Sequence, residues 1–168
     1  PGFMRACVPC LALLLAASGV AAEEVAVPAA PPPLDARVAA ALDAAGLKYG
    51  ADEGDFRLVL NVADGRSQVV WVASATTKLS QLEIRDVWAL GARGEGQVPP
   101  EVARRLLTEN ARMVVGAWQV NQAPDRYLVV YLAQLPAASD AASLRVVIEA
   151  VAVSADRMER ELSAGDEF

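Results

Sequence analysis

Residues 7–10, Cys-Val-Pro-Cys, have the C-x-x-C spacing with which two thiols can form and break a disulfide. Such a redox motif needs a strand before it and a helix after it, whereas this one begins an apolar run close to Met4. These cysteines are the chain's complete set of 2, and histidine is absent. A His-dependent catalytic triad, a His-ligated zinc site and a His-ligated haem are therefore excluded.

Carboxylates are the remaining candidates for metal or acid–base chemistry. Residues 52–55, Asp-Glu-Gly-Asp, lack the ligand spacing and closing glutamate of a calcium loop, so they are interpreted as a solvated turn. Asp156, Glu159 and Glu161 alternate with arginines, which predicts a salt-paired, solvated helix face. Residues 91–96 are rich in glycine but lack a phosphate-loop ending, so they are expected to form a flexible loop. The sequence thus indicates no catalytic, metal or cofactor site, and we expect a protein that is not an enzyme.

Residues 4–22, MRACVPCLALLLAASGVAA, read as a secretory signal peptide. Arg5 supplies a positive start, an apolar run follows, and Val20-Ala21-Ala22 places small residues at the cleavage site. Both cysteines lie in this leader. The Pro/Ala-rich residues 23–33 are expected to form an extended linker. We therefore expect a periplasmic or secreted protein with a cleavable leader, and a retained membrane anchor is the alternative.

The charge of the chain limits its partners. It has 21 acidic and 15 basic residues, a formal net charge of −6, and no basic stretch. This balance does not suit the phosphate backbone of nucleic acid or an anionic lipid surface. We expect no nucleic-acid partner, and no membrane partner once the leader is removed.

Residues 34–163 are predicted to form one α+β domain, followed by an acidic tail at 164–168 that frays. Apolar residues at helical or alternating spacing, separated by turn signals, mark its elements. In chain order these are a helix at 34–45, strands at 56–62, 67–74 and 82–90, a helix at 99–109, strands at 113–121 and 126–135, and a helix from Ser139 or Asp140 to Leu162. The order α-βββ-α-ββ-α indicates an antiparallel sheet with helices packed on it.

Four short segments resemble the YbjN family, often described as a putative bacterial sensory transduction regulator. They are Leu42-Asp-Ala-Ala-Gly-Leu-Lys-Tyr49, the Asp/Glu/Gly turn before Phe56, Leu106-Leu-Thr-Glu-Asn110, and Ala155-Asp-Arg-Met-Glu159. The resemblance implies a fold like that of the class I chaperones of type III secretion. It also implies a small protein-binding module, with no catalytic residues to carry over. The leader and the linker are departures from those chaperones, which act in the cytosol.

Several predicted strands are apolar on both faces, although a sheet with one wet face should alternate. An apolar face left exposed would mark a partner surface. We expect Val59, Val70, Val72 and Val87 to contribute to a face that binds a protein or peptide client, or a second copy in a homodimer. The alternative is a periplasmic carrier that holds a small apolar ligand between sheet and helices. Its groove would be lined by Trp71, Trp88 and Trp118.

Overall fold

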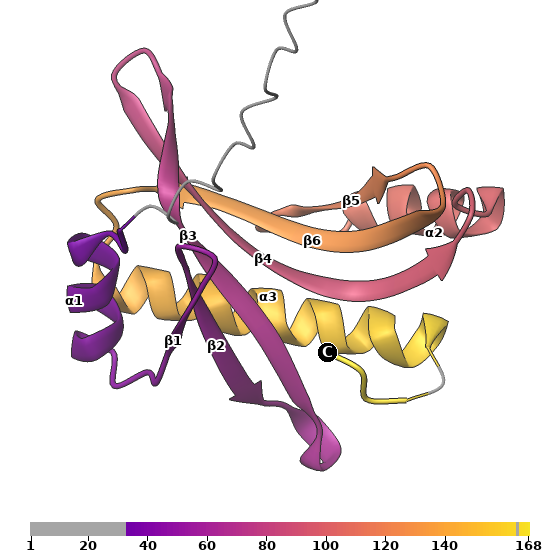
Figure 1. Cartoon of the computed structure of the whole chain (residues 1–168), viewed down its shortest axis with the longest axis horizontal. Coiled ribbons are helices and arrows are strands. Elements are labelled where there is room, and N and C mark those ends of the chain that lie inside the picture. Colours follow the sequence, from indigo (N-terminus) through magenta and orange to yellow (C-terminus); the bar gives the residue numbers. More distant parts are fainter. Residues whose placement is uncertain (1–32, 164) are drawn as a thin grey trace, which may run out of the picture. The chain divides into compact units, whose positions relative to one another are not determined.

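The structure is a computed structural model that describes residues 33–163 and 165–168. The predicted signal peptide, and the linker up to residue 32, lie outside these described residues. Within them the fold is α+β, with a six-stranded antiparallel sheet and three α-helices (Figure 1). No helix among these residues has the length and apolar character needed to cross a bilayer.

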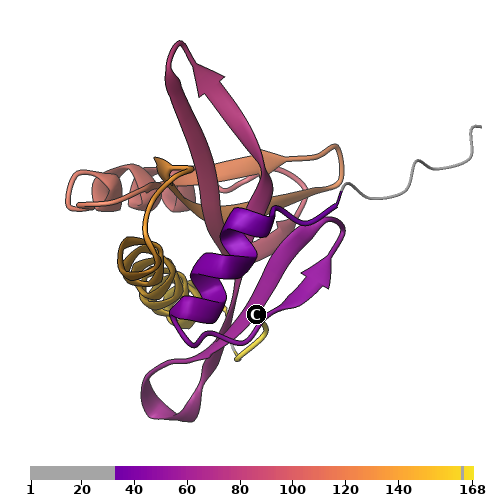
Figure 2. The ribbon, with the colours of Figure 1, turned by 90° about the vertical axis from the view of Figure 1, so that its left-hand side faces the viewer.

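The elements follow the predicted order, with one further short strand. Their bounds are α1 Ala36–Ala44, β1 Gly50–Asp52, β2 Asp55–Asn61, a 3-10 turn at Ala63–Gly65, β3 Ser67–Leu79, β4 Leu82–Glu95, α2 Pro100–Asn110, β5 Ala117–Gln122, β6 Arg126–Pro136 and α3 Ala141–Leu162. The strands lie in the order β1-β2-β3-β4-β6-β5. The β3–β4 hairpin extends well beyond the other strands (Figures 1 and 2).

Local signals explain where the helices begin and end. The Asp35 side chain accepts a hydrogen bond from the backbone of Arg37 and caps α1, which ends before Gly46 at φ 67°. Asp140 accepts a hydrogen bond from the Ser143 amide at 2.7 Å and caps α3. Of the two cap residues predicted for the last helix, the structure therefore uses Asp140.

Strand register separates the two faces of the sheet. One row of paired residues crosses four strands, and each of its members is 0 % exposed: Phe56, Val72, Val87 and Ala133. The next row along the strands points to the opposite face, because successive residues of a strand alternate. This second row is Arg57, Trp71, Trp88, Leu132 and Ala117.

All three helices contribute to the core on the first face. Their buried residues form one cluster with Phe56 and its row: Val38 and Leu42 of α1, Leu106 of α2, and Leu144, Ile148, Val151, Ala152, Ala155 and Met158 of α3. Helix α3 contacts β3, β4 and β6 (Figure 1). None of the residues of the second row belongs to this core.

The prediction of a flexible loop at residues 91–96 is wrong for most of this range, because β4 continues to Glu95. Its glycines serve packing. A Cβ on Gly91 would lie 2.7 Å from the Trp118 ring, and one on Gly94 would lie 2.5 Å from the Tyr127 ring. Real atoms do not approach so closely, so aromatic rings over the strand require glycine there.

Candidate functional site

The face of the sheet opposite the helices carries apolar side chains from β3, β4 and β6. We call it the open face. At its centre Trp71 and Trp88 stack with ring centroids 4.3 Å apart and planes 8° from parallel. The Trp71 indole N–H donates to Asp52 Oδ2 at 2.8 Å, which orients the ring pair. Both rings are neither fully buried nor fully exposed, so this face can give up further apolar area to a partner.

A shallow depression of about 310 Å³ lies beside Trp88 on the open face. Its lining is mainly apolar with polar groups at the margin: Asp86, Trp88, Leu90, Gln119, Asn121, Leu128, Val130 and Leu132. Gln134 donates to Asp86 across the strands at 3.0 Å, which closes one end with a polar pair. An apolar centre with a polar rim is the arrangement found in protein-binding patches.

The predicted partner-binding valines do not lie together. Val70, Val72 and Val87 are 0 % exposed and pack under the helices, so their assignment to an exposed face is wrong. Val59 pairs with Val69 on the open face and is 56 % exposed. The physical reason is strand parity, because β3 is apolar on both faces and its sequence does not show which face the helices cover.

The three tryptophans also divide between the two faces. Trp71 and Trp88 lie on the open face, whereas Trp118 is 5 % exposed and packs on Tyr131 in the core, 4.9 Å between ring centroids. The structure therefore does not assemble the predicted three-tryptophan groove between sheet and helices.

The edge strand β5 is closed to a pairing partner near its start, at Trp118. Asn110, the last residue of α2, accepts a hydrogen bond from the Trp118 amide at 2.6 Å and donates to the Trp118 carbonyl at 3.1 Å. A side chain that satisfies an outward-facing backbone pair prevents another strand from adding there. The open face is therefore more accessible to a partner than the β5 edge of the sheet.

The acidic turn at 52–55 has structural contacts. Asp52 accepts from Trp71, and Asp55 Oδ1 accepts from the Ser74 amide at 2.8 Å. Across the described residues, no group of three or more potential metal ligands is found. The expected solvated turn becomes a short hairpin, because β1 pairs with β2 around it.

Buried carboxylates join the helices, and the sequence interpretation missed them. Glu109 of α2 is 3 % exposed and binds Arg105 at 2.6 Å and Arg157 of α3 at 2.7 Å. The Arg105 guanidinium holds the pKa of Glu109 below its ordinary value against the effect of burial. These contacts make Glu109 a fixed anion between two helices, which does not suit proton transfer.

Asp156 and Glu159 form a second buried pair, at 6 % and 0 % exposure. Arg66 binds Asp156 at 2.6 Å and Glu159 at 3.0 Å. The predicted solvated face is therefore wrong for these two residues. A signal was present, because Glu159 follows Ala155 by one helical turn and so lies on the buried stripe of α3.

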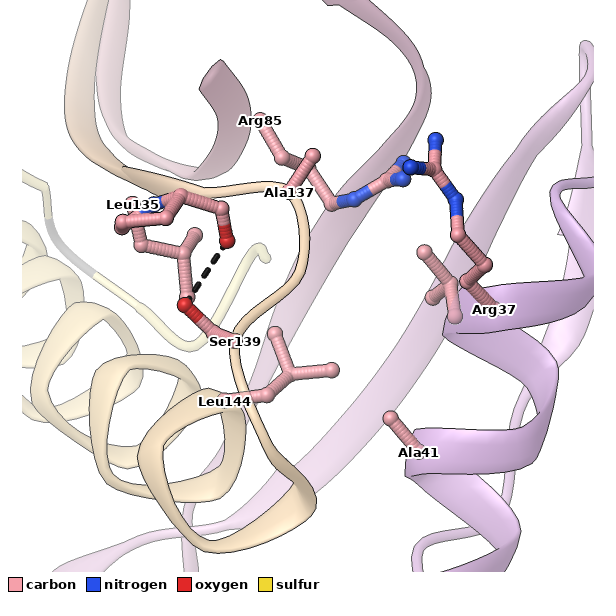
Figure 3. Close-up of a pocket in the computed structure, with 9 residues that line it drawn as sticks. Arg37, Ala41, Arg85, Leu135, Ala137, Ser139 and Leu144 are labelled. Atoms are coloured by element: carbon pink, nitrogen blue, oxygen red, sulfur yellow. Dashed lines mark hydrogen bonds between the residues drawn. The ribbon is translucent and has the colours of Figure 1, made fainter. Parts of the chain in front are cut away.

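Arg85 forms a third buried ionic cluster, at the start of α1. It is 2 % exposed, binds Asp35 at 2.6 Å and donates to the carbonyls of Ala73 and Ser74. Asp35 also binds Arg37 at 2.7 Å, so two guanidinium groups share one carboxylate. Figure 3 shows the Arg37 and Arg85 side chains pointing toward one another. The cavity beside them measures about 10 Å³, which is room for about one water molecule and no larger ligand.

The Arg37 side chain of this third cluster also hydrogen-bonds Glu83, and this contact predicts that the stability of the fold depends on pH. Arg37 and then Thr76 hydrogen-bond Glu83 and lower its pKa from 4.5 to about 2. A carboxyl whose pKa is lower in the folded state stabilises the fold above pH 4.5, and this stabilisation is lost as the pH falls towards 2. We expect Glu83→Gln to be less stable than the parent at pH 6, with the difference shrinking over that interval. Urea unfolding at several pH values measures it, and a difference independent of pH would contradict the assignment.

Comparisons of the chain with protein-family models, with curated proteins and with solved structures found no match. The open face and the three ionic clusters are therefore interpreted from their own geometry.

Proposed function

We propose that this chain is an exported, non-enzymatic module of YbjN type, with a fold like that of the type III secretion chaperones, and that it binds an apolar segment of another protein on the open face. The observation that carries this proposal is the stacked Trp71–Trp88 pair beside the depression lined by Leu90, Leu128 and Leu132. Apolar side chains of the segment would enter the depression and be buried against its apolar lining.

Two features support binding over catalysis. The buried acids at Glu109, Asp156 and Glu159 are paired with arginines and hold elements of the fold together. The open face, in contrast, carries aromatic and aliphatic side chains that are partly exposed. A partner that covers them stabilises the complex mainly by burying their apolar area. Burying apolar area contributes roughly 25 cal/mol per Å², so a segment that covers several of these side chains gains usable affinity.

A purified-protein experiment tests the open face. The probe is a fluorescent nine-residue peptide in which leucine and serine alternate, titrated with the full chain and followed by anisotropy. We expect Leu132→Asp to weaken binding by at least about tenfold, since a carboxylate in the depression must be desolvated. Val146→Asp is the matched control, because Val146 is 64 % exposed on α3 and away from the depression.

The outcomes separate the possible occupants. Peptide binding that is equal in the Leu132→Asp and Val146→Asp variants would refute the open face as the site. Native mass spectrometry of the same preparation would detect a retained small apolar molecule, the result that favours the carrier. A dimer lost on Leu132→Asp would instead assign the face to a second copy.

A further inference from the structure

The strands β3 and β4 pair at one end of the hairpin and separate towards the other. Their pairing runs from Leu79 opposite Leu82 to Trp71 opposite Trp88. Beyond that pair β3 extends back to Ser67 and β4 forward to Glu95, and the two diverge (Figure 1). Divergence leaves the facing backbone groups of both strands in need of other partners.

Residues 165–168 enter this opening, and we call them the 165–168 segment. The Phe168 carbonyl accepts a hydrogen bond from the Val69 amide of β3 at 2.8 Å. Arg66 donates to the Gly165 carbonyl at 3.3 Å. The sequence indicates a frayed tail here, whereas these contacts place the segment beside the start of β3.

A buried carboxylate holds the backbone of the segment. Glu159 Oε1 accepts the amide N–H groups of Glu167 at 2.5 Å and Phe168 at 3.1 Å, while its Oε2 accepts from Arg66 at 3.0 Å. Glu159 is 0 % exposed, so its position is set by the fold. Because amide N–H groups are common to nearly all residues, this contact recognises an extended backbone more than a particular side chain.

Two arginines add a side-chain preference. Arg66 lies 3.3 Å from the Asp166 carboxylate, and Arg93 lies 3.4 Å from the Glu167 carboxylate. The Arg93 guanidinium also lies 5.4 Å from the centroid of the Phe168 ring. The opening therefore favours two acidic residues followed by an aromatic one.

The neighbouring Gln68 connects the two strands where they separate. This residue is 0 % exposed, and its Nε2 donates to the Leu90 carbonyl of β4 at 3.0 Å. Its Oε1 is buried without a hydrogen-bond partner within the described residues. The Gln68 side chain therefore holds β3 to β4 beside the opening.

We propose that this opening, formed by Arg66, Val69, Arg93 and Glu159, is a binding slot for an extended acidic-aromatic segment of a partner protein, and that the 165–168 segment occupies it in competition. Val69 and Glu159 of the slot are buried, but the side chains that pair with the segment or belong to it are exposed: they are 38 % accessible at Asp166, 40 % at Glu167 and 64 % at Arg93. Exposed ion pairs contribute little, so the segment can be displaced.

The test is a competition measured on the full chain. The probe is a fluorescent peptide with the sequence of residues 163–168, Ser-Ala-Gly-Asp-Glu-Phe. It is titrated with the parent chain and with the triple variant Asp166→Ala, Glu167→Pro, Phe168→Pro, in which proline removes the two amide N–H groups that donate to Glu159. We expect the triple variant to bind at least about tenfold more tightly, because its own segment no longer occupies the slot and the competent fraction rises.

Two controls make the result specific. Arg93→Glu in the triple variant should weaken binding by about tenfold, and this exposed substitution leaves the core intact. A peptide N-methylated at the Glu and Phe amides should fail to bind, because it cannot donate to Glu159. Equal affinity for the parent and the triple variant, or undiminished binding of the methylated peptide, would overturn the proposal.

Sedimentation of the parent chain distinguishes the source of the segment. A monomer at all concentrations agrees with a partner protein as the occupant. Dimers that disappear in the triple variant would contradict that part of the proposal and assign the slot to the segment of a second copy. The probe contains no leucine and does not require the open face, so failure here is distinct from failure of the proposed function.

Discussion

Val72→Asp is expected to unfold the protein, whereas Val59→Asp is expected to leave it folded. Val72 is 0 % exposed in the row that packs under α3, and Val59 is 56 % exposed on the open face. An aspartate at 72 loses the burial of valine and places a carboxylate in an apolar core. The cost should exceed about 4 kcal/mol, a large part of the stability of a domain of this size. At position 59 the cost should stay below about 1 kcal/mol.

Urea unfolding followed by far-UV circular dichroism measures both variants. The Val59→Asp protein should unfold at nearly the same urea concentration as the parent, in line with a loss of less than about 1 kcal/mol. The Val72→Asp protein should be unfolded or strongly shifted at 25 °C. Similar stabilities for the two variants would show that the faces are not divided as the strand register indicates.

Arg66→Ala is the second substitution with a large expected effect. It removes the cation shared by Asp156 and Glu159, which are 6 % and 0 % exposed. Breaking a buried ion pair from one side leaves an uncompensated charge and costs about 3–5 kcal/mol. Arg160 still reaches Asp156 at 3.0 Å, so most of the loss should come from Glu159.

The matched control is Arg145→Ala. Arg145 pairs with Glu149 at 2.8 Å on the outside of α3, and both side chains are about half exposed. Its loss should cost no more than about 1 kcal/mol. Thermal unfolding of both variants at equal pH gives the comparison, and equal losses would mean that Glu159 is not a buried charge in need of Arg66.

The arrangement of helices and strands was predictable because it depends on local patterns. Alternation, turn residues and the stripe from Leu144 to Met158 predicted every helix and five strands, although β1 was missed. β1 is Gly50–Asp52, too short for alternation to show. The continuation of β4 through Gly91 and Gly94 was missed because glycine normally signals a turn, and here it makes room for rings that arrive from other strands.

The sites were less predictable because they depend on which face the helices cover. Val70 and Trp71 are adjacent apolar residues, and their burial differs only through strand parity relative to α3. The buried ion pairs were missed for a related reason, because they also depend on contacts between distant parts of the chain. Arg66 meets Glu159 across 93 positions of sequence, so no local pattern joins them. Leu162 follows Met158 by four residues and so continues the apolar stripe by spacing, but it is 36 % exposed at the end of α3.

The central claim, that the open face binds another protein, is tested most directly by site-specific photo-crosslinking in cells with a native envelope. One crosslinker replaces Gln119, which lines the depression, and another replaces Arg104, an exposed residue of α2. We expect the crosslinker at position 119 to capture a distinct partner protein, and the crosslinker at position 104 to capture none. Leu132→Asp should abolish the capture from position 119. Equal capture from both positions, or capture from Gln119 that survives Leu132→Asp, would contradict the claim.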